Sequence, residues 1–461
     1  MQPRLVAELG ELPALNITSL DNVYQQGKTD IIAAMSQICR KLMQDLGVKW
    51  KPQPVDEALR RCAIDWIKTE LEPEVGTVSK RFLLSTDAGL KFTERCYEEG
   101  DFATKASMVK FASLAIYLDD IIDKDGAMAS QAGSFLLSIM NRSSRKTTNR
   151  PSTHGIWLEV YRKVSVELAS HMSDPLASSM ILHSCTIFIE SSALEFSIQK
   201  NQEKYYLVKS GVAEHARDED ERRLARDGGF DIPLPLDSDR LAPDGHLMPH
   251  GWPIWLRERT AVAEAFAITF FRPPGGVDLP VWAWVTAISE MRTFLLATND
   301  LLSFSKELMD DDTTSSIAVI TKERRLIDIP GSAPDGGWCL RDSVEEVFGK
   351  AVAAAARINR ILRPTNPKTR YAPGGQSYSV AELVALLKRP PHELSNLNFD
   401  HADVMKALAL KLWETHQKGY VIWHFACPRY RTYELFDYVR DMMGPESAGA
   451  EWLTESFRHV T

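Results

Sequence analysis

The chain reads NDLLSFSKE at residues 299–307, and this stretch predicts a helix with two unlike faces. Asn299, Ser303 and Glu307 recur every four residues, so an α-helix places their oxygen atoms on one face. Leucines before and among them, at 295, 296, 301 and 302, are expected to pack the other face into an apolar core. Asn and Ser are poor helix-interior residues, so their recurrence at this spacing indicates a functional face rather than an ordinary solvated surface.

A second acidic stretch, DDIID at residues 119–123, has carboxylates at the same four-residue spacing. Asp119 and Asp123 lie one helical turn apart and share a face. If this face opposes the 299–307 face, the two would hold Mg²⁺, because carboxylate, amide and hydroxyl oxygens suit that hard ion better than zinc or copper. The pair of stretches therefore predicts a magnesium site between two helices. Alone, the 119–123 stretch would equally be an exposed helix end.

Apolar residues recur with helical period along most of the chain, and alternating strand patterns are rare. The predicted fold class is therefore all-α. Helices are expected over residues 30–46, 56–71, 103–122, 156–171, 178–199, 255–271, 281–309, 343–362 and 401–427.

Polar, Pro- and Gly-rich breaks near 201–251 and 325–385 are expected to be surface insertions in a single domain that spans residues 1–461. The first break carries a run of charges and little apolar periodicity, which is typical of a solvated insertion. A lid that orders over the site is the alternative interpretation.

Composition narrows the class of protein. Of the 461 residues, 44% are apolar, which is enough for a large core. The formal net charge of −8 argues against a nucleic-acid partner, because phosphate backbones need a basic face. Six scattered cysteines without paired spacing are typical of a reducing compartment. Neither a signal-type start nor an apolar run of about 18 residues is seen, so we expect a cytoplasmic protein without a membrane span.

A third stretch, GYVIWHFACPRYR at residues 419–431, lies near the C-terminal end of the sequence. In this order and spacing, the three stretches resemble the motifs of class I terpene synthases, in particular those of the trichodiene-synthase-like fungal sesquiterpene cyclases. The resemblance implies a class I terpenoid synthase helical bundle with an apolar central cavity. The chain departs from that group at Cys427 and Pro428, where an acidic and a basic residue are usual.

The resemblance also implies a set of metal ligands. Three Mg²⁺ ions would be bound between the two acidic helices, with Asp119 bridging two of them. Glu190, on a strongly apolar helix, resembles a further carboxylate near the metals, or else satisfies a helix-packing contact. The implied metal ligands are Asp119, Asp123, Asn299, Ser303, Glu307 and Glu190.

A set of diphosphate donors follows from the same resemblance: Arg257, Lys306, Arg429 and Tyr430. Arg259 is a weaker candidate for the role of Arg257. Asp120 points about 100° away from Asp119 in a helix, and it is a candidate partner for Arg429.

Aromatic side chains on the same helices are candidates for the cavity wall, because aromatic faces stabilise a cationic intermediate. They are Phe111, Phe188, Tyr420 and Trp423. Each alone is more often plain core, and of these four only Tyr420 and Trp423 join the diphosphate donors as candidate substrate-binding residues.

The predicted activity is that of a terpene synthase. The reaction is Mg²⁺-dependent ionisation and cyclisation of farnesyl diphosphate, with release of diphosphate and formation of a cyclic sesquiterpene hydrocarbon or alcohol, longiborneol being the favoured product. The predicted catalytic residues are Asp119, Asn299, Ser303, Glu307, Arg429 and Tyr430.

Two alternatives stay open: a monoterpene cyclase that uses geranyl diphosphate, and a non-catalytic helical binding protein on the same scaffold. A chain-elongating prenyltransferase would need a second aspartate-rich motif, and a class II cyclase would need a DxDD motif; neither is seen. The expected partner is an isoprenoid diphosphate, and monomer and homodimer both stay open.

Overall fold

A computed structural model describes residues 28–50, 56–122, 124–133, 153–200, 255, 257–259, 262–275, 278–309, 315–318, 320–321, 340–369, 377–396 and 399–443. Within these ranges every regular element is a helix and no strand occurs, which confirms the all-α class. None of the described helices is long and apolar enough to cross a bilayer. The 201–251 insertion lies outside the described residues, so its role as solvated segment or lid stays a prediction.

The bundle is built from long helices that mostly match the predicted ranges. These are α3 (Lys28–Asp45), α6 (Lys80–Cys96), α7 (Phe102–Ile122), α10 (Thr153–Ser170), α11 (Pro175–Lys200), α17 (Ile288–Met309), α19 (Leu340–Ile361) and α22 (His401–Ala426). Shorter α-helices join them: α4 (Glu57–Trp66), α5 (Glu72–Val75), α8 (Gly126–Gly133), α16 (Ala263–Thr269), α20 (Val380–Leu387), α21 (Pro391–Asn396), α23 (Thr432–Leu435) and α24 (Asp437–Met443). The π-helix η2 (Ile67–Leu71) and the 3-10 turns η3 (Val281–Ala283), η4 (Val285–Ala287), η5 (Pro367–Thr369) and η6 (Pro428–Tyr430) complete the set.

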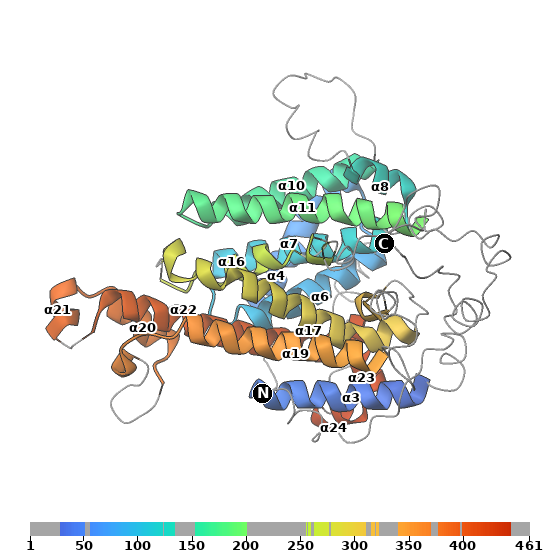
Figure 1. Ribbon diagram of the computed structural model, residues 1–461. Coiled ribbons are helices and arrows are strands. Elements are labelled where there is room, and N and C mark those ends of the chain that lie inside the picture. The colour runs from blue at the N-terminus through green and yellow to red at the C-terminus, as the bar shows by residue number, and fades with distance from the viewer. Residues whose placement is uncertain are drawn as a thin grey trace, which may run out of the picture.

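Six of these helices close into a ring. Going round it, α6 packs on α7, α7 on α11, α11 on α16, α16 on α17, α17 on α22, and α22 again on α6. Outside the ring, α10 covers α7 and α11, while α19 and α3 cover α17. In Figure 1, α8, α10 and α11 lie along the upper side, α3 and α24 along the lower side, and α20 and α21 project from one end.

The apolar period of the sequence did not predict helix α6, although α6 is one of the six helices of the ring. Its buried face includes Ser85, Thr86 and Thr93, so the apolar period is weak. All three hydroxyls donate to carbonyl oxygens of the same helix: Ser85 Oγ to Arg81 O at 3.2 Å, Thr86 Oγ1 to Phe82 O at 3.0 Å and Thr93 Oγ1 to Gly89 O at 2.9 Å. Because these bonds satisfy the polar atoms inside the helix, a helix buried between two others tolerates them.

Two glycines set how closely α6 meets its neighbours. A Cβ at Gly89 would lie 2.8 Å from the backbone nitrogen of Ser113 on α7. A Cβ at Gly419 of α22 would overlap the backbone carbonyl of Arg95 on α6. Both contacts are with backbone, which cannot rotate away, so glycine at these sites permits the α7–α6–α22 packing.

The prediction of one helix over 281–309 was partly wrong. The segment starts with the 3-10 turns η3 and η4, and the α-helix begins only at Ile288. Trp284, with φ of −136°, interrupts the helical backbone between the two turns. Its ring is fully buried against Phe271, with the ring centroids 5.1 Å apart, so packing of this large side chain overrides the local helical period.

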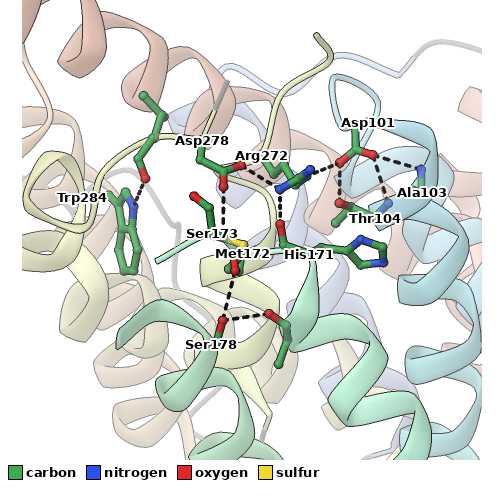
Figure 2. Close-up of polar contacts among 12 residues, drawn as sticks. Asp101, Ala103, Thr104, His171, Met172, Ser173, Ser178, Arg272, Asp278 and Trp284 are labelled. Carbon is green, nitrogen blue, oxygen red and sulfur yellow. Dashed lines mark hydrogen bonds and ion pairs between the residues drawn. The ribbon is translucent and has the colours of Figure 1, made fainter. Parts of the chain in front are cut away.

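A polar cluster around Arg272 lies at the end of the bundle where α7 begins (Figure 2). Arg272 Nε donates to Asp101 Oδ2 at 3.0 Å, and Nη1 donates to Asp278 Oδ1 at 2.8 Å and to the His171 carbonyl. Asp101 in turn accepts from the first backbone N–H groups of α7, including that of Thr104 at 3.2 Å. The cluster therefore ties the start of α7 to the ends of α10 and α16, a helix length away from Asp119.

Candidate active site

A cavity of about 230 Å³ lies inside the ring, lined by side chains from all six helices. Ten of the residues expected at a site from sequence line this one cavity: Asp119, Arg257, Asn299, Ser303, Lys306, Glu307, Tyr420, Trp423, Arg429 and Tyr430. Asp119 and Glu307, on which the predicted magnesium site depends, thus line the same cavity.

Polarity changes along three of the helices that line the cavity, α7, α17 and α22. On α7 the lining residues are Ala112, Ala115 and Ile116, followed by Asp119 in the last two turns. On α17 leucines 295 and 296 precede the NDLLSFSKE stretch, and on α22 two aromatic residues precede the arginine and tyrosine that follow the helix. The C-terminal ends of these three helices therefore make a polar mouth above an apolar floor. Their dipoles add a field that favours cations at the mouth.

Arg429 bridges the two adjacent carboxylates of the first motif. Its Nη1 lies 2.8 Å from Asp120 Oδ1 and its Nη2 lies 3.3 Å from Asp119 Oδ2. The expected pair of Arg429 with Asp120 therefore forms, and Arg81 holds Asp120 from the other side, with its Nη2 2.8 Å from the Asp120 carbonyl oxygen. Burial raises the pKa of Asp119, while Arg429 lowers it.

Arg257 pairs with the second motif. Its Nε donates to Asp300 Oδ1 at 2.8 Å, and its Nη2 donates to the side-chain oxygen of Asn299. Although burial lowers the pKa of the Arg257 guanidinium, Asp300 and Glu195 raise it above the usual value. Arg257 is thus a permanent cation at the mouth. Its weaker rival Arg259 does not line the cavity and lies over the ring of Trp255, 4.9 Å from the centroid.

Ser303 provides the test of whether this face fits a metal ion. Its hydroxyl lines the cavity, is buried, and has no hydrogen-bond partner among the described residues. A buried hydroxyl without a partner is rare in a folded protein, and an oxygen-seeking cation between Asn299 and Glu307 would satisfy it. The residues present therefore fit Mg²⁺.

Two of the implied ligands are not among the described residues that line the cavity. Asp123 lies outside the described residues. Glu190 is described but is not among the lining residues, whereas Glu195 on the same helix is. Glu195 follows the lining residue Phe188 by two helical turns and shares its face, but the sequence alone does not show which face of α11 meets the cavity. Where the structure describes the chain, no group of three or more His, Cys, Asp or Glu side chains is arranged around a metal position.

Aromatic side chains form the apolar wall. Tyr420 and Trp423 line it, as expected, and their polar tips are tied to backbone: Tyr420 Oη donates to Leu295 O at 3.1 Å, and Trp423 Nε1 donates to Ala88 O at 3.0 Å. Phe92, which the sequence analysis missed, packs edge-on against Trp423 with the ring centroids 5.0 Å apart. These hydrogen bonds and ring contacts fix the orientation of the Tyr420 and Trp423 rings at the cavity wall.

Of the other two wall candidates, Phe188 lines the cavity and Phe111 does not. Phe111 is fully buried between α7 and α10, with its ring centroid 5.6 Å from that of Tyr161. The reason is rotation along α7: Ala112 lies seven residues before Asp119 and shares its face, whereas Phe111 lies eight before it and turns away.

His424 is a further residue of the site that the sequence analysis missed. It lies on α22 with its ring fully buried, and its Nε2 is 3.2 Å from Asn299 Nδ2. Burial lowers the pKa of His424 to about 3, so the ring is neutral. Only its place in the third motif could have marked it, because a histidine among aromatic residues is usually plain core.

The relatives that match the chain in sequence are named as terpene synthases. No protein-family model matches the chain. Terpene synthase BipA of Cochliobolus sativus is 25% identical over 285 residues, which cover 61% of this chain and 70% of the relative. Alpha-cuprenene synthase COP6 of Coprinopsis cinerea is 24% identical over 195 residues, 42% of each chain. Both names are those of terpene synthases.

Solved structures with a similar course of the chain include germacradien-4-ol synthase from Streptomyces citricolor, with a TM-score of 0.46, 12% identity and coverage of 81% of this chain and 95% of that one. Linalool/nerolidol synthase from Streptomyces clavuligerus has a TM-score of 0.42 and 13% identity, and the match covers 82% of this chain and 98% of that one.

Proposed function

We propose that this protein is a class I terpene synthase, which binds the diphosphate of an isoprenoid substrate at the polar mouth and folds the hydrocarbon chain against the apolar wall. One observation carries the proposal: Asp119, Asn299, Ser303 and Glu307 line the same cavity as the aromatic rings of Tyr420 and Trp423. An ordinary solvated acidic face would not open onto an apolar floor. The similarity to proteins named as terpene synthases supports the same class.

The reaction begins when the allylic carbon–oxygen bond breaks and its electron pair leaves with the diphosphate. Bound Mg²⁺ supplies the positive charge that offsets the charge developing on this leaving group. Asp119, Asn299, Ser303 and Glu307 are the residues that would hold it, and the hydroxyl of Ser303, with no partner in the described part of the chain, supports that assignment.

Arg257 and Arg429 are the proposed diphosphate donors, aided by Lys306 and Tyr430, which line the same mouth. Both guanidiniums keep their charge, since neighbouring carboxylates raise their pKa against the effect of burial. A guanidinium has five N–H donors in a fixed plane, so each arginine can bind a phosphate oxygen while it still holds a carboxylate.

The cavity floor would protect the carbocation that ionisation leaves behind. Faces of aromatic rings stabilise a cation by about 0.5 to 2 kcal/mol each, and more where water is excluded. Phe92, Phe266, Tyr420 and Trp423 line the floor, and their contacts keep them in place. The final cation loses a proton or captures water, which decides between hydrocarbon and alcohol.

We infer farnesyl diphosphate as substrate and a cyclic sesquiterpene as product, with longiborneol favoured, from the resemblance of the three motifs to the trichodiene-synthase-like cyclases. A cytoplasmic location is a further prediction, and monomer and homodimer both stay open.

Purified protein should be incubated with Mg²⁺ and farnesyl, geranyl or geranylgeranyl diphosphate. Volatile products would be identified by mass spectrometry and free diphosphate would be measured in parallel, with chelation of Mg²⁺ as control. We expect a cyclic C15 product from farnesyl diphosphate that vanishes on chelation. A cyclic product from geranyl diphosphate alone would favour the monoterpene cyclase, and no diphosphate release from any of the three would leave the binding protein standing.

A further inference from the structure

Asn299 can serve as a metal ligand in only one of its two amide orientations. The oxygen Oδ1 can donate a lone pair to a cation, while the NH₂ group presents two hydrogens and would repel it. The two ends of an amide have nearly the same size, so packing alone does not select between them. Some neighbour with a defined donor or acceptor must decide.

His424 is such a neighbour, because the position of its ring proton follows from geometry. Its Nδ1 lies 2.8 Å from the backbone oxygen of Tyr420, and a carbonyl oxygen can only accept a hydrogen bond. Nδ1 therefore carries the ring proton, and in the neutral ring Nε2 is an acceptor. The group that faces Nε2 at 3.2 Å must be a donor, which is Nδ2 of Asn299.

The opposite side of the same amide gives an independent check. A guanidinium can only donate, and the Nη2 of Arg257 donates to Asn299 Oδ1. The donor Arg257 on one side of the amide and the acceptor His424 on the other thus require the same orientation of Asn299. Tyr430 Oη, 3.3 Å from Asn299 Nδ2, accepts as well, but a hydroxyl can also donate and does not by itself select one end.

We propose that His424 is a positioning residue that holds the amide of Asn299 with its oxygen turned into the cavity, where Mg²⁺ would bind. This inference rests on the proposed function. His424 touches neither the cavity nor its contents, since it is fully buried and acts only through Asn299. It is held in turn by the rings of Tyr420 and Tyr430, whose centroids lie 4.6 and 4.3 Å from its own.

The test compares two substitutions of nearly equal shape. His424→Gln keeps an acceptor near the place of Nε2, whereas His424→Met fills similar space without a comparable acceptor. Binding of Mn²⁺ in the presence of inorganic pyrophosphate would be measured by electron paramagnetic resonance, which needs no turnover. We expect the methionine variant to bind Mn²⁺ at least about tenfold more weakly, as is usual when a partner of a metal ligand is lost, and the glutamine variant to stay near the wild type.

His416→Phe is the matched control. His416 lies two turns earlier on α22, is equally buried, and bonds through Nδ1 to the Cys96 carbonyl at 3.2 Å, without contact to Asn299. Its substitution should leave the Mn²⁺ affinity unchanged. With turnover as a second readout, His424→Met should raise the Mg²⁺ concentration for half-maximal rate while KM for the diphosphate at saturating Mg²⁺ changes little.

Thermal unfolding would confirm that each variant is folded, and His424→Phe replaces the methionine variant if that one is not. Wild-type Mn²⁺ affinity in the methionine or phenylalanine variant overturns the inference. So does a folded glutamine variant that binds as weakly as these. If the wild type itself binds no Mn²⁺ with pyrophosphate, the proposed function fails first and the inference with it.

Discussion

At the scale of single residues, the site contains a buried hydroxyl that no described residue satisfies. Ser303 Oγ is buried at the polar mouth, and within the described ranges nothing bonds to it. An unpaired buried hydroxyl lowers stability by about 1 to 3 kcal/mol, so a hydroxyl kept at this position indicates a role in binding. Function and stability therefore oppose each other at this residue.

Ser303→Ala should separate the two effects. The free energy of unfolding in the absence of Mg²⁺ should stay unchanged or rise by up to about 1 kcal/mol, because the unpaired hydroxyl is gone. Turnover at limiting Mg²⁺ should fall at least about tenfold, since loss of a ligand weakens the metal at least as much as loss of a ligand's partner. Urea unfolding and product formation measure the two, and a variant that loses stability but keeps its rate would contradict the metal assignment.

His416 gives a prediction on pH. Burial lowers its pKa to about 3 from 6.5, so below pH 6.5 the unfolded chain binds a proton that the folded chain does not. Stability is therefore unaffected by this group above pH 6.5 and falls as the pH drops from there toward 3. Between pH 7 and pH 5 the wild type should lose about 2 kcal/mol more than His416→Phe in urea unfolding. Equal losses in the two proteins would show that this ring titrates normally.

At the scale of elements, small residues decide how the ring of helices closes. Gly419 lets α22 approach the backbone of α6, and α22 carries Tyr420 and Trp423 into the cavity wall directly after it. Thr432 then bonds to the carbonyl oxygens of His424 and Phe425 at 3.2 and 3.1 Å, which helps to end α22 ahead of Arg429. The register of one helix thus sets the position of both wall and mouth.

Gly419→Ala should therefore be costly. The added methyl group overlaps the Arg95 carbonyl, so α22 and α6 must separate, at a loss of about 1 to 3 kcal/mol in the free energy of unfolding. Gly349→Ala is the control: it lies inside α19, and no atom is within 4 Å of its added Cβ. That variant should gain about 0.5 to 1 kcal/mol from the lower helix entropy cost. Equal effects in both variants would refute the steric argument.

At the scale of the whole molecule, the two ends of the bundle carry different groups of polar residues. The polar mouth gathers the groups that would bind metal and diphosphate, while the Arg272 cluster joins the start of α7 to α10 and α16 at the other end (Figure 2). The length of α7, 21 residues, separates the two ends. Changes at the end that holds the Arg272 cluster should therefore act on stability without changing the groups at the mouth.

Arg272→Leu tests that separation. It leaves Asp101 and Asp278 without their shared partner, which should lower the free energy of unfolding by about 1 to 3 kcal/mol. The loss is smaller than for a fully buried ion pair, because these side chains are partly exposed. Mn²⁺ affinity measured well below the unfolding temperature should not change. Arg162→Leu, which breaks a pair within α10 alone, should shift stability by less than about 0.5 kcal/mol. A tenfold loss of metal affinity in Arg272→Leu would show that the ends are coupled.

The sequence by itself determined the helical class and the residues that share a face, because the period of an α-helix relates side chains three and four positions apart. It therefore predicted that Asn299, Ser303 and Glu307 act together. Only the tertiary structure decided that Glu195 rather than Glu190 lines the cavity, and that His424 from another helix lies against the amide of Asn299. The physical reason is that contacts between helices depend on how each helix is rotated and how closely it packs, and neither quantity is contained in the period of a single helix.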